Sequence, residues 1–235
     1  MSKTIAVFGA GPGLGQAVAH RYAREGYAVV VVARRPEPLD RLTAELTSNG
    51  ARAYAIAADL ADTGAVPALA ERIRATIGEP DVLYYGAAAN GFGSVLDLTP
   101  ERVDELMPLG VHALLALVRE FLPAMVARRE GAILSAQGAS AVQGNPSIAG
   151  GLTLAAQRNL LQALHAAVAD QGVYVAGLYI GAAIENTPFH ARMEAAKAAG
   201  DPVPAIPSVR PADLAELLWT MHHRTRPPEV TYPEV

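Results

Sequence analysis

The sequence predicts an α/β protein built on one doubly wound parallel sheet with helices packed on both faces. Two observations support this fold class. Short runs of apolar and β-branched residues alternate with helical segments along nearly the whole chain. The first run also leads into a helix through a glycine-rich turn, Gly9-Ala10-Gly11-Pro12-Gly13-Leu14-Gly15.

The elements follow in the order that a parallel sheet requires, each strand leading into a crossover helix. Strands are expected at residues 5–9, 27–33, 53–57, 81–85, 132–136 and 173–180, with a short edge strand at 229–232. Helices are expected at residues 16–25, 38–49, 65–77, 100–129, 152–170 and 211–224. The run 27–33 is continuously apolar, as is typical of a parallel strand covered on both faces. Pro108 can break the long helix 100–129.

Composition predicts one compact domain over residues 1–235. Hydrophobic residues make up 51% of the chain and charged residues 18%, and no repeat or interdomain linker interrupts the alternation. Residues 186–210 contain four prolines and few β-branched residues. This segment is therefore expected to form a lid-like excursion over the sheet.

Charge and cysteine content exclude several classes of function. The net charge is −4 and there is no extended basic cluster, so a nucleic-acid partner is not expected. The absence of cysteine excludes disulfides, thiolate metal sites and cysteine nucleophiles. The longest apolar runs are shorter than the roughly 20 residues of a membrane-spanning helix, so we expect a cytoplasmic protein with no membrane partner. No His or Glu spacing predicts a metal site.

The glycine-rich turn predicts a nucleotide-binding site. Glycine lets the backbone turn sharply and approach a pyrophosphate, whose charge then meets the free N–H groups at the start of a helix. A tight turn without a ligand is the alternative, but one glycine would suffice for that. The residues expected to bind the cofactor here are Gly9, Gly11, Pro12, Gly13, Leu14 and Gly15.

The spacing G-x-x-x-G-x-G and the order of elements resemble the short-chain dehydrogenases/reductases, and the resemblance covers nearly the whole chain. It implies a Rossmann-type three-layer α/β/α sandwich that binds a nicotinamide cofactor. Phe8 stands where this family usually has threonine. The departure is minor for binding, because backbone groups make most of the phosphate contacts.

The end of the second strand predicts NADP as the cofactor. An NAD-binding protein places an acidic residue about 20 positions after the glycines, whereas this chain has Arg34 and Arg35 there. Two cations suit a 2′-phosphate, and Arg34 can also lie against the adenine ring. The alternative is a solvated surface pair.

The family resemblance assigns further cofactor contacts. Asp59 and Leu60 occupy the positions of its adenine-contacting pair, with a helix N-cap as the competing role for Asp59. The family sequence Asn-Asn-Ala-Gly falls on Tyr85-Gly86-Ala87-Ala88, so Gly86, Ala87 and Ala88 are expected beside the cofactor. The paired asparagines are absent.

The same resemblance places the proton relay on residues without functional groups. The family's Ser, Tyr, Lys and Asn fall on Gly138, Gly151, Ala155 and Gly110. No shift of register restores the Tyr and the Lys, because no tyrosine lies between Tyr85 and Tyr174 and no lysine between Lys3 and Lys197. Other polar residues are expected near the carboxyl edge, the edge of the sheet where the carboxyl ends of the parallel strands lie. They are Tyr85, His112, Gln137, Ser140, Asn145, Tyr179 and Glu185.

Tyr179 is the candidate replacement acid, because it ends a strand just before Ile180-Gly181, which resembles the family's segment beside the nicotinamide. A core tyrosine with a polar tip is the alternative. The predicted function is an NADP(H)-dependent oxidoreductase with a non-standard active site acting on a small organic substrate. The rival hypothesis is a catalytically inactive sensor of NADP(H) or a metabolite, and a non-redox enzyme is a third.

Assembly is expected from the long helix 100–129 and the helix after Leu152, which in the family pack against a second subunit. The apolar residues of the long helix outnumber what one buried face can hold, so some should meet a partner. They are Leu114, Leu115, Leu117, Val118 and Phe121. The sequence thus predicts a homodimer or a homotetramer.

Overall fold

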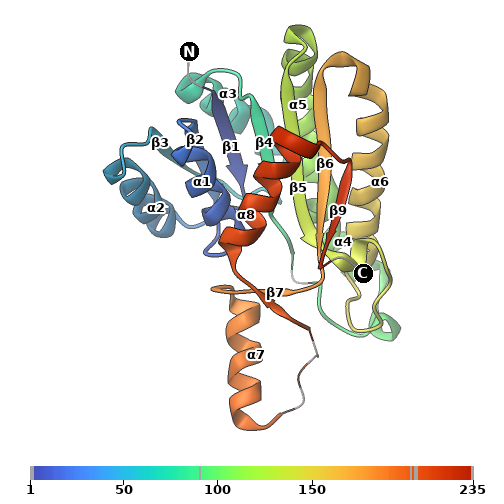
Figure 1. The fold of residues 1–235 in the computed structure, drawn as a ribbon. Helices are drawn as coiled ribbons and strands as arrows, with labels where there is room; N and C mark the ends of the chain where they lie inside the picture. Colours follow the sequence, from blue (N-terminus) through green and yellow to red (C-terminus); the bar gives the residue numbers. More distant parts are fainter. Residues whose placement is uncertain (1–2, 90, 202, 204–205, 234–235) are drawn as a thin grey trace.

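The computed structural model describes residues 3–89, 91–201, 203 and 206–233. Figure 1 shows one twisted sheet between two layers of helices. The sheet has seven strands in the order β3-β2-β1-β4-β5-β6-β9, and every neighbouring pair is parallel. The strands are β1 (Thr4–Phe8), β2 (Ala28–Ala33), β3 (Ala53–Ala57), β4 (Val82–Tyr85), β5 (Gly131–Gly138), β6 (Val173–Ile180) and β9 (Glu229–Tyr232). The predicted doubly wound parallel sheet is confirmed.

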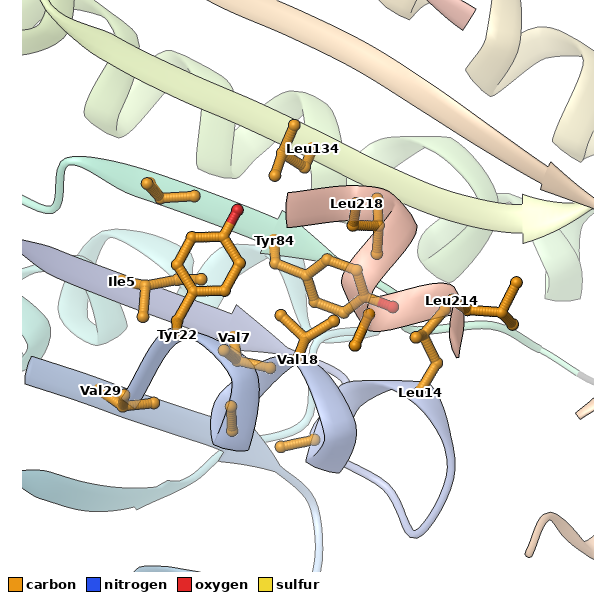
Figure 2. Packing of buried hydrophobic residues seen from close by; sticks show 14 of the residues in the cluster. Ile5, Val7, Leu14, Val18, Tyr22, Val29, Tyr84, Leu134, Leu214 and Leu218 are labelled. Atoms are coloured by element: carbon orange, nitrogen blue, oxygen red, sulfur yellow. The ribbon is translucent and has the colours of Figure 1, made fainter. Parts of the chain in front are cut away.

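Side chains alternate between the two faces of the sheet and so build two cores. Ile5 and Val7 of β1 belong to the core beneath α1 (Leu14–Arg24), α2 (Pro36–Ser48) and α8 (Pro211–Thr220). Ala6 and Phe8 belong to the core beneath α3 (Val66–Ile77), α5 (Ala113–Arg128) and α6 (Gly151–Val168). Figure 2 shows the first core, with Tyr22 and Val18 of α1 beside the β1 residues.

The long helix is continuous through Pro108, the possible break within it. It consists of α4 (Pro100–Met107), a π-helical turn (Pro108–His112) and α5. The wider turn accommodates the proline, which has no N–H to donate. Over Pro100–Arg128 this helix is long and apolar enough to cross a membrane, with 39% of its most apolar window buried. Its buried residues, Ala113, Leu114, Leu117, Val118, Phe121 and Met125, face the sheet, so core packing accounts for part of that apolar character.

The expected excursion stands beyond the carboxyl ends of the strands. It includes α7 (Pro188–Ala199), which extends away from the sheet in Figure 1. Two short parallel strands, β7 (Ala183–Ile184) and β8 (Ser208–Val209), pair at the base of the excursion. Thr187 caps α7 by accepting a hydrogen bond from the His190 N–H at 3.2 Å. Residues 202 and 204–205 of the expected excursion lie outside the described residues, as do 1–2 and 234–235 of the expected domain.

Candidate functional site

The glycine-rich turn packs so tightly that side chains are excluded at two positions. Gly9 has φ +89°, and a Cβ there would lie 2.5 Å from the backbone nitrogen of Ala87. A Cβ at Gly15 would collide with the carbonyl oxygen of Gly9. A Cβ at Gly11 would meet none of the described residues within 4 Å, so the turn is open to a ligand at that point.

The start of α1 is left free to bind an anion. Its N-cap residue, Gly13, supplies no side-chain capping bond, and the first turn contains no acidic residue. The positive end of the helix dipole therefore has no internal counter-charge. Leu14 is buried in the core and Pro12 is exposed, so Leu14 anchors the turn from below while Pro12 borders solvent.

Backbone hydrogen bonds join the turn to the neighbouring strand ends. The N–H groups of Gly9 and Ala10 donate to the Val32 carbonyl at 3.0 and 3.1 Å. The Gly86 N–H donates to the Phe8 carbonyl at 2.9 Å. The structure thus brings the predicted residues Gly86 and Ala87 against Gly9, while Ala88 lies exposed just beyond them.

The two arginines follow β2 directly and are exposed. Arg35 is the N-cap of α2, and Arg34 lies two residues after the carbonyl that holds the glycine turn. Within the described part of the chain, neither arginine forms a salt bridge. Both charges are therefore available to an anionic ligand beside the turn.

Asp59 is exposed at the end of β3 and caps a local turn. Its Oδ1 accepts from the Ala61 N–H at 3.0 Å, whereas the N-cap of α3 is Ala65, so the N-cap alternative for Asp59 is wrong. Asp59 also lines a cavity of about 230 Å³ between β3 and α3. The side chain of Leu60 is buried in the core, so only its backbone can face a ligand.

The excursion contacts both ends of the carboxyl edge. Gly13 is buried beneath it, and a Cβ there would lie 2.6 Å from Cγ2 of Thr187. At the other end, Phe189 of α7 stacks on Phe92 of the loop after β4, with ring centroids 4.8 Å apart and planes at 10°. The base of the excursion therefore contacts the carboxyl edge at both ends, while α7 extends away from the sheet (Figure 1).

The four positions that the resemblance assigned to the relay lie at the β5 and α6 end of the same edge. Gly138 ends β5, Gly151 begins α6, Ala155 follows one turn later and Gly110 lies in the π-helical turn. An asparagine would not fit at position 110, because a Cβ there would lie 2.7 Å from the Thr153 side chain.

The loop before α6 also packs closely on the loop after β4. The Gly150 N–H donates to the Gly91 carbonyl at 2.9 Å, and a Cβ at Gly150 would lie 2.6 Å from Cα of Gly91. Gly93 and Ile148 form a parallel β-bridge beside them. These contacts close the two loops onto each other next to the positions that the resemblance assigned to the relay.

A buried polar chain that the sequence analysis missed supports this end. Ser135 Oγ donates to Gln157 Oε1 at 3.0 Å, and Gln157 Nε2 donates to the Gly110 carbonyl at 2.7 Å. Gln157 thereby ties α6 to β5 and to the π-helical turn, whose carbonyls lack the usual α-helical partners. Helical spacing does not distinguish this glutamine from a surface residue, because its partners come from distant segments.

The other polar residues expected near the edge have local partners or lie apart from the relay positions. The Tyr85 hydroxyl donates to the Leu109 carbonyl at 2.6 Å, and Asn145 Oδ1 accepts from the Ser147 N–H at 2.9 Å. His112 is exposed in the π-helical turn. Glu185 lines a groove of about 820 Å³ between α1, α2 and the base of the excursion, which reaches the glycine turn only at Gly13.

Tyr179 faces away from the carboxyl edge. A Cβ at Gly177, two residues upstream in β6, would collide with the Tyr179 hydroxyl, so the side chain leans back along the strand. The hydroxyl donates to Glu229 Oε1 at 3.0 Å, and Arg158 pairs with the same carboxylate at 2.7 Å. Burial, with the Glu229 charge, raises the pKa of Tyr179 above its ordinary value. The structure favours the core-tyrosine alternative.

Among the described residues, no group of three or more His, Asp or Glu side chains is arranged to hold a metal ion.

The fold and the glycine-rich site define a nucleotide-binding α/β protein. The chain belongs to the short-chain dehydrogenase family, whose model matches residues 3–197. Oxidoreductase UcpA of Escherichia coli K12 is 30% identical over 175 residues, which cover 74% of this chain and 66% of UcpA. The chain spans about half to two thirds of the length of the curated relatives that it matches first.

Solved structures agree on the fold. L-sorbose reductase from Gluconobacter frateurii, complexed with NADPH and L-sorbose, superposes with a TM-score of 0.83 at 25% identity, covering 94% of this chain and 89% of the reductase. Actinorhodin polyketide ketoreductase with NADPH gives a TM-score of 0.87 at 22% identity, covering 98% of this chain and 95% of that one. The second likeness bears on the fold alone.

Proposed function

We propose that this protein binds NADP(H) and is an oxidoreductase with a non-standard active site that acts on a small organic substrate. One observation carries the proposal. The glycine turn is hydrogen-bonded to the strand whose end presents two exposed arginines without salt bridges in the described chain. A backbone cradle for a pyrophosphate and cations for a 2′-phosphate therefore stand side by side.

The residues present fit a dinucleotide along the whole cofactor half of the edge. The turn from Gly11 to Gly13 and the start of α1 would hold the pyrophosphate, because the turn has open space at Gly11 among the described residues and the first turn of α1 has no acidic residue. Arg34 and Arg35 would hold the 2′-phosphate, and exposed Asp59 would accept from an adenine amine. NADPH, when bound, supplies hydride for the reduction of a carbonyl or imine.

The chain's own contribution to such a reaction is positioning rather than acid catalysis. The excursion would keep water from the edge through its contacts at Gly13 and Phe92. The relay positions offer no acid, and the Tyr179 hydroxyl is engaged with Glu229. Loss of general acid help typically slows a reaction by roughly 10² to 10⁴. The proton would then come from water, and turnover would be slow and substrate-restricted.

A sensor without turnover is the second candidate function. The observation that favours it is the close packing of Gly91 on Gly150 beside the emptied relay, which leaves little means of reacting with a ligand. Such a protein would bind NADP(H) and change the position of its excursion without transferring hydride.

Two measurements on the unmodified protein decide between these functions. Calorimetry gives the affinities for NADPH and NADH, and absorbance at the NADPH band follows consumption against a panel of carbonyl and imine compounds. Binding with consumption supports the oxidoreductase, and binding without consumption supports the sensor. Failure to bind either nucleotide would overturn both.

We also propose a homodimer or a homotetramer. Of the five apolar residues that suggested an interface, four are buried within the monomer. Leu115, which is 39% exposed, is the one that can still contact a second subunit. Leu152 on α6 is 43% exposed and adds to it. Multi-angle light scattering is expected to give at least twice the 24.5 kDa chain mass at micromolar concentration. A species of one chain mass would contradict the proposal.

A further inference from the structure

Buried polar atoms without a hydrogen-bond partner gather at the carboxyl end of β5. In the described part of the chain they include both amide atoms of Gln137 and the hydroxyl of Ser140. The Gln137 residue is only 7% exposed. Native proteins pair nearly all such groups, so an unpaired buried amide points to a partner that binds there.

The two groups flank the emptied relay positions. Gln137 directly precedes Gly138, and a Cβ at Gly138 would lie 3.6 Å from the Ser140 Oγ. A Cβ at Gly151 would lie 3.2 Å from the Cβ of Ser140. The side chains that a family relay would supply are missing here, and two unpaired polar groups remain.

Gln137 faces the α6 side of the sheet. It is the register partner of Tyr179, and it lies two residues after Ser135, which bonds to Gln157 of α6. The charged groups on this face, Arg158 and Glu229, neutralise each other at 2.7 Å. Neither Gln137 nor Ser140 carries a charge of its own.

We propose that Gln137 and Ser140 recognise a neutral polar group of the substrate or ligand: a carbonyl, a hydroxyl or a carboxamide. This inference rests on the proposed function and narrows its substrate class. An amide carries both donors and an acceptor, and a hydroxyl can act as either. A carbonyl oxygen would accept from Gln137 Nε2, and the corresponding alcohol would donate to its Oε1. Neither side chain carries a charge, so neither would offset the cost of burying an ionised carboxylate or ammonium.

The rim of this end of the edge is apolar, which indicates the rest of the ligand. Phe92 is 49% exposed and stacks on Phe189. Val95, Leu96 and Val142 lie exposed on the two loops that the Gly93 to Ile148 bridge joins. The ligand class is therefore an aryl or aliphatic molecule with one neutral carbonyl, hydroxyl or carboxamide group.

A thermal test needs neither cofactor nor substrate. Gln137→Met removes an amide that has no partner, so its melting temperature is expected to equal or exceed that of the unmodified protein. Gln157→Met is the matched control, because it removes a buried amide with two hydrogen bonds and is expected to lower the melting temperature. A fall as large in Gln137→Met as in the control would show a satisfied structural amide and overturn the proposal.

A binding test uses benzamide and benzoate on the protein saturated with NADPH, whose nicotinamide ring is uncharged. Benzamide is expected to bind at least about tenfold more tightly than benzoate, and Gln137→Met is expected to weaken benzamide by about tenfold with NADPH affinity unchanged. Ser140→Ala should weaken it less. Unchanged benzamide affinity in Gln137→Met, or no preference over benzoate, would overturn the proposal. A failure of the proposed function would show itself separately, as absent NADPH binding.

Discussion

The two ends of the carboxyl edge differ in which atoms would act on a ligand. At the β1 and β2 end, backbone N–H groups and a helix start form the cradle, and Gly9 and Gly15 are required by packing within the fold. At the β5 and α6 end, the resemblance expects four functional side chains and the chain has Gly138, Gly151, Ala155 and Gly110.

This difference teaches that substitutions affect the two kinds of site differently. A substitution in a backbone site disturbs the fold, whereas a substitution in a side-chain site can leave the fold intact. A backbone site is part of the chain path, so changing Gly9 or Gly15 disturbs the contacts of β1 and α1 themselves. A side-chain site can be emptied without moving the backbone. The likeness to an NADPH-bound reductase therefore extends across the fold. The chemistry of the β5 and α6 end has to be inferred from the residues that this chain has there.

The largest effect is expected at the packed glycine. Gly15→Ala drives a Cβ into the Gly9 carbonyl, so we expect NADPH affinity to fall by at least about 100-fold, with a loss of about 1–3 kcal/mol in the free energy of unfolding. Gly11→Ala is the control, because its Cβ meets nothing within 4 Å in the protein. Calorimetry and denaturant unfolding measure both quantities. Equal stability of the two variants would contradict the packing argument.

The next effect concerns the β5 and α6 end. The triple variant Gly138→Ser, Gly151→Tyr, Ala155→Lys places the family's relay residue types at the positions that the resemblance assigns to them, and on the proposed function we expect about 100-fold faster reduction of a simple aryl ketone. Ser140 must shift by a few tenths of an ångström to admit the tyrosine Cβ.

The matched control for that graft carries Gly151→Phe in place of Gly151→Tyr and so lacks only the hydroxyl. The rate at which NADPH absorbance falls gives the turnover of both triple variants. If the two triple variants reduce the ketone equally fast, the relay geometry has not survived at this end.

A smaller effect tests the cofactor end by charge alone. Arg34→Ala should weaken NADPH binding by roughly 10-fold or more, the equivalent of about 1.5–3 kcal/mol for a charge-assisted hydrogen bond, and leave NADH nearly unchanged. Arg41→Ala on the exposed face of α2 is the control cation. Calorimetry on the unmodified protein should show NADPH bound more tightly than NADH, and equal affinities would refute the role of the arginines.

The sequence predicted the fold well because its evidence is local. Apolar runs, glycine stops and the glycine-rich turn set each strand and helix, and parallel order follows from their alternation. The excursion was predicted to leave the sheet, but its helix α7 was not predicted. The helix begins at Pro188 after the Thr187 cap, and its sequence has little of the amphipathic pattern that reveals a helix.

The site was predictable only where backbone geometry defines it. The contact of Gly9 with Ala87 follows from neighbouring strand ends. The direction of the Tyr179 side chain does not follow from the strand order. It depends on the space that Gly177 leaves and on Glu229, which lies on the last strand, β9. The unpaired amide of Gln137 was likewise visible only after the neighbours of β5 were in place.

The smallest effect is expected at Tyr179, and it separates the two ends most cleanly. Tyr179→Phe keeps the ring under Arg158 and removes the hydroxyl that donates to Glu229, so unfolding free energy should fall by about 1 kcal/mol. Turnover and NADPH affinity should not change, because the hydroxyl points back over Gly177 rather than toward the edge. Denaturant unfolding and NADPH consumption measure these quantities, with Tyr85→Phe as a second buried tyrosine whose hydroxyl has one carbonyl partner. A large fall in turnover in Tyr179→Phe alone would return the tyrosine to the role of proton donor, and the hydroxyl would then have to swing to the carboxyl edge when a cofactor binds.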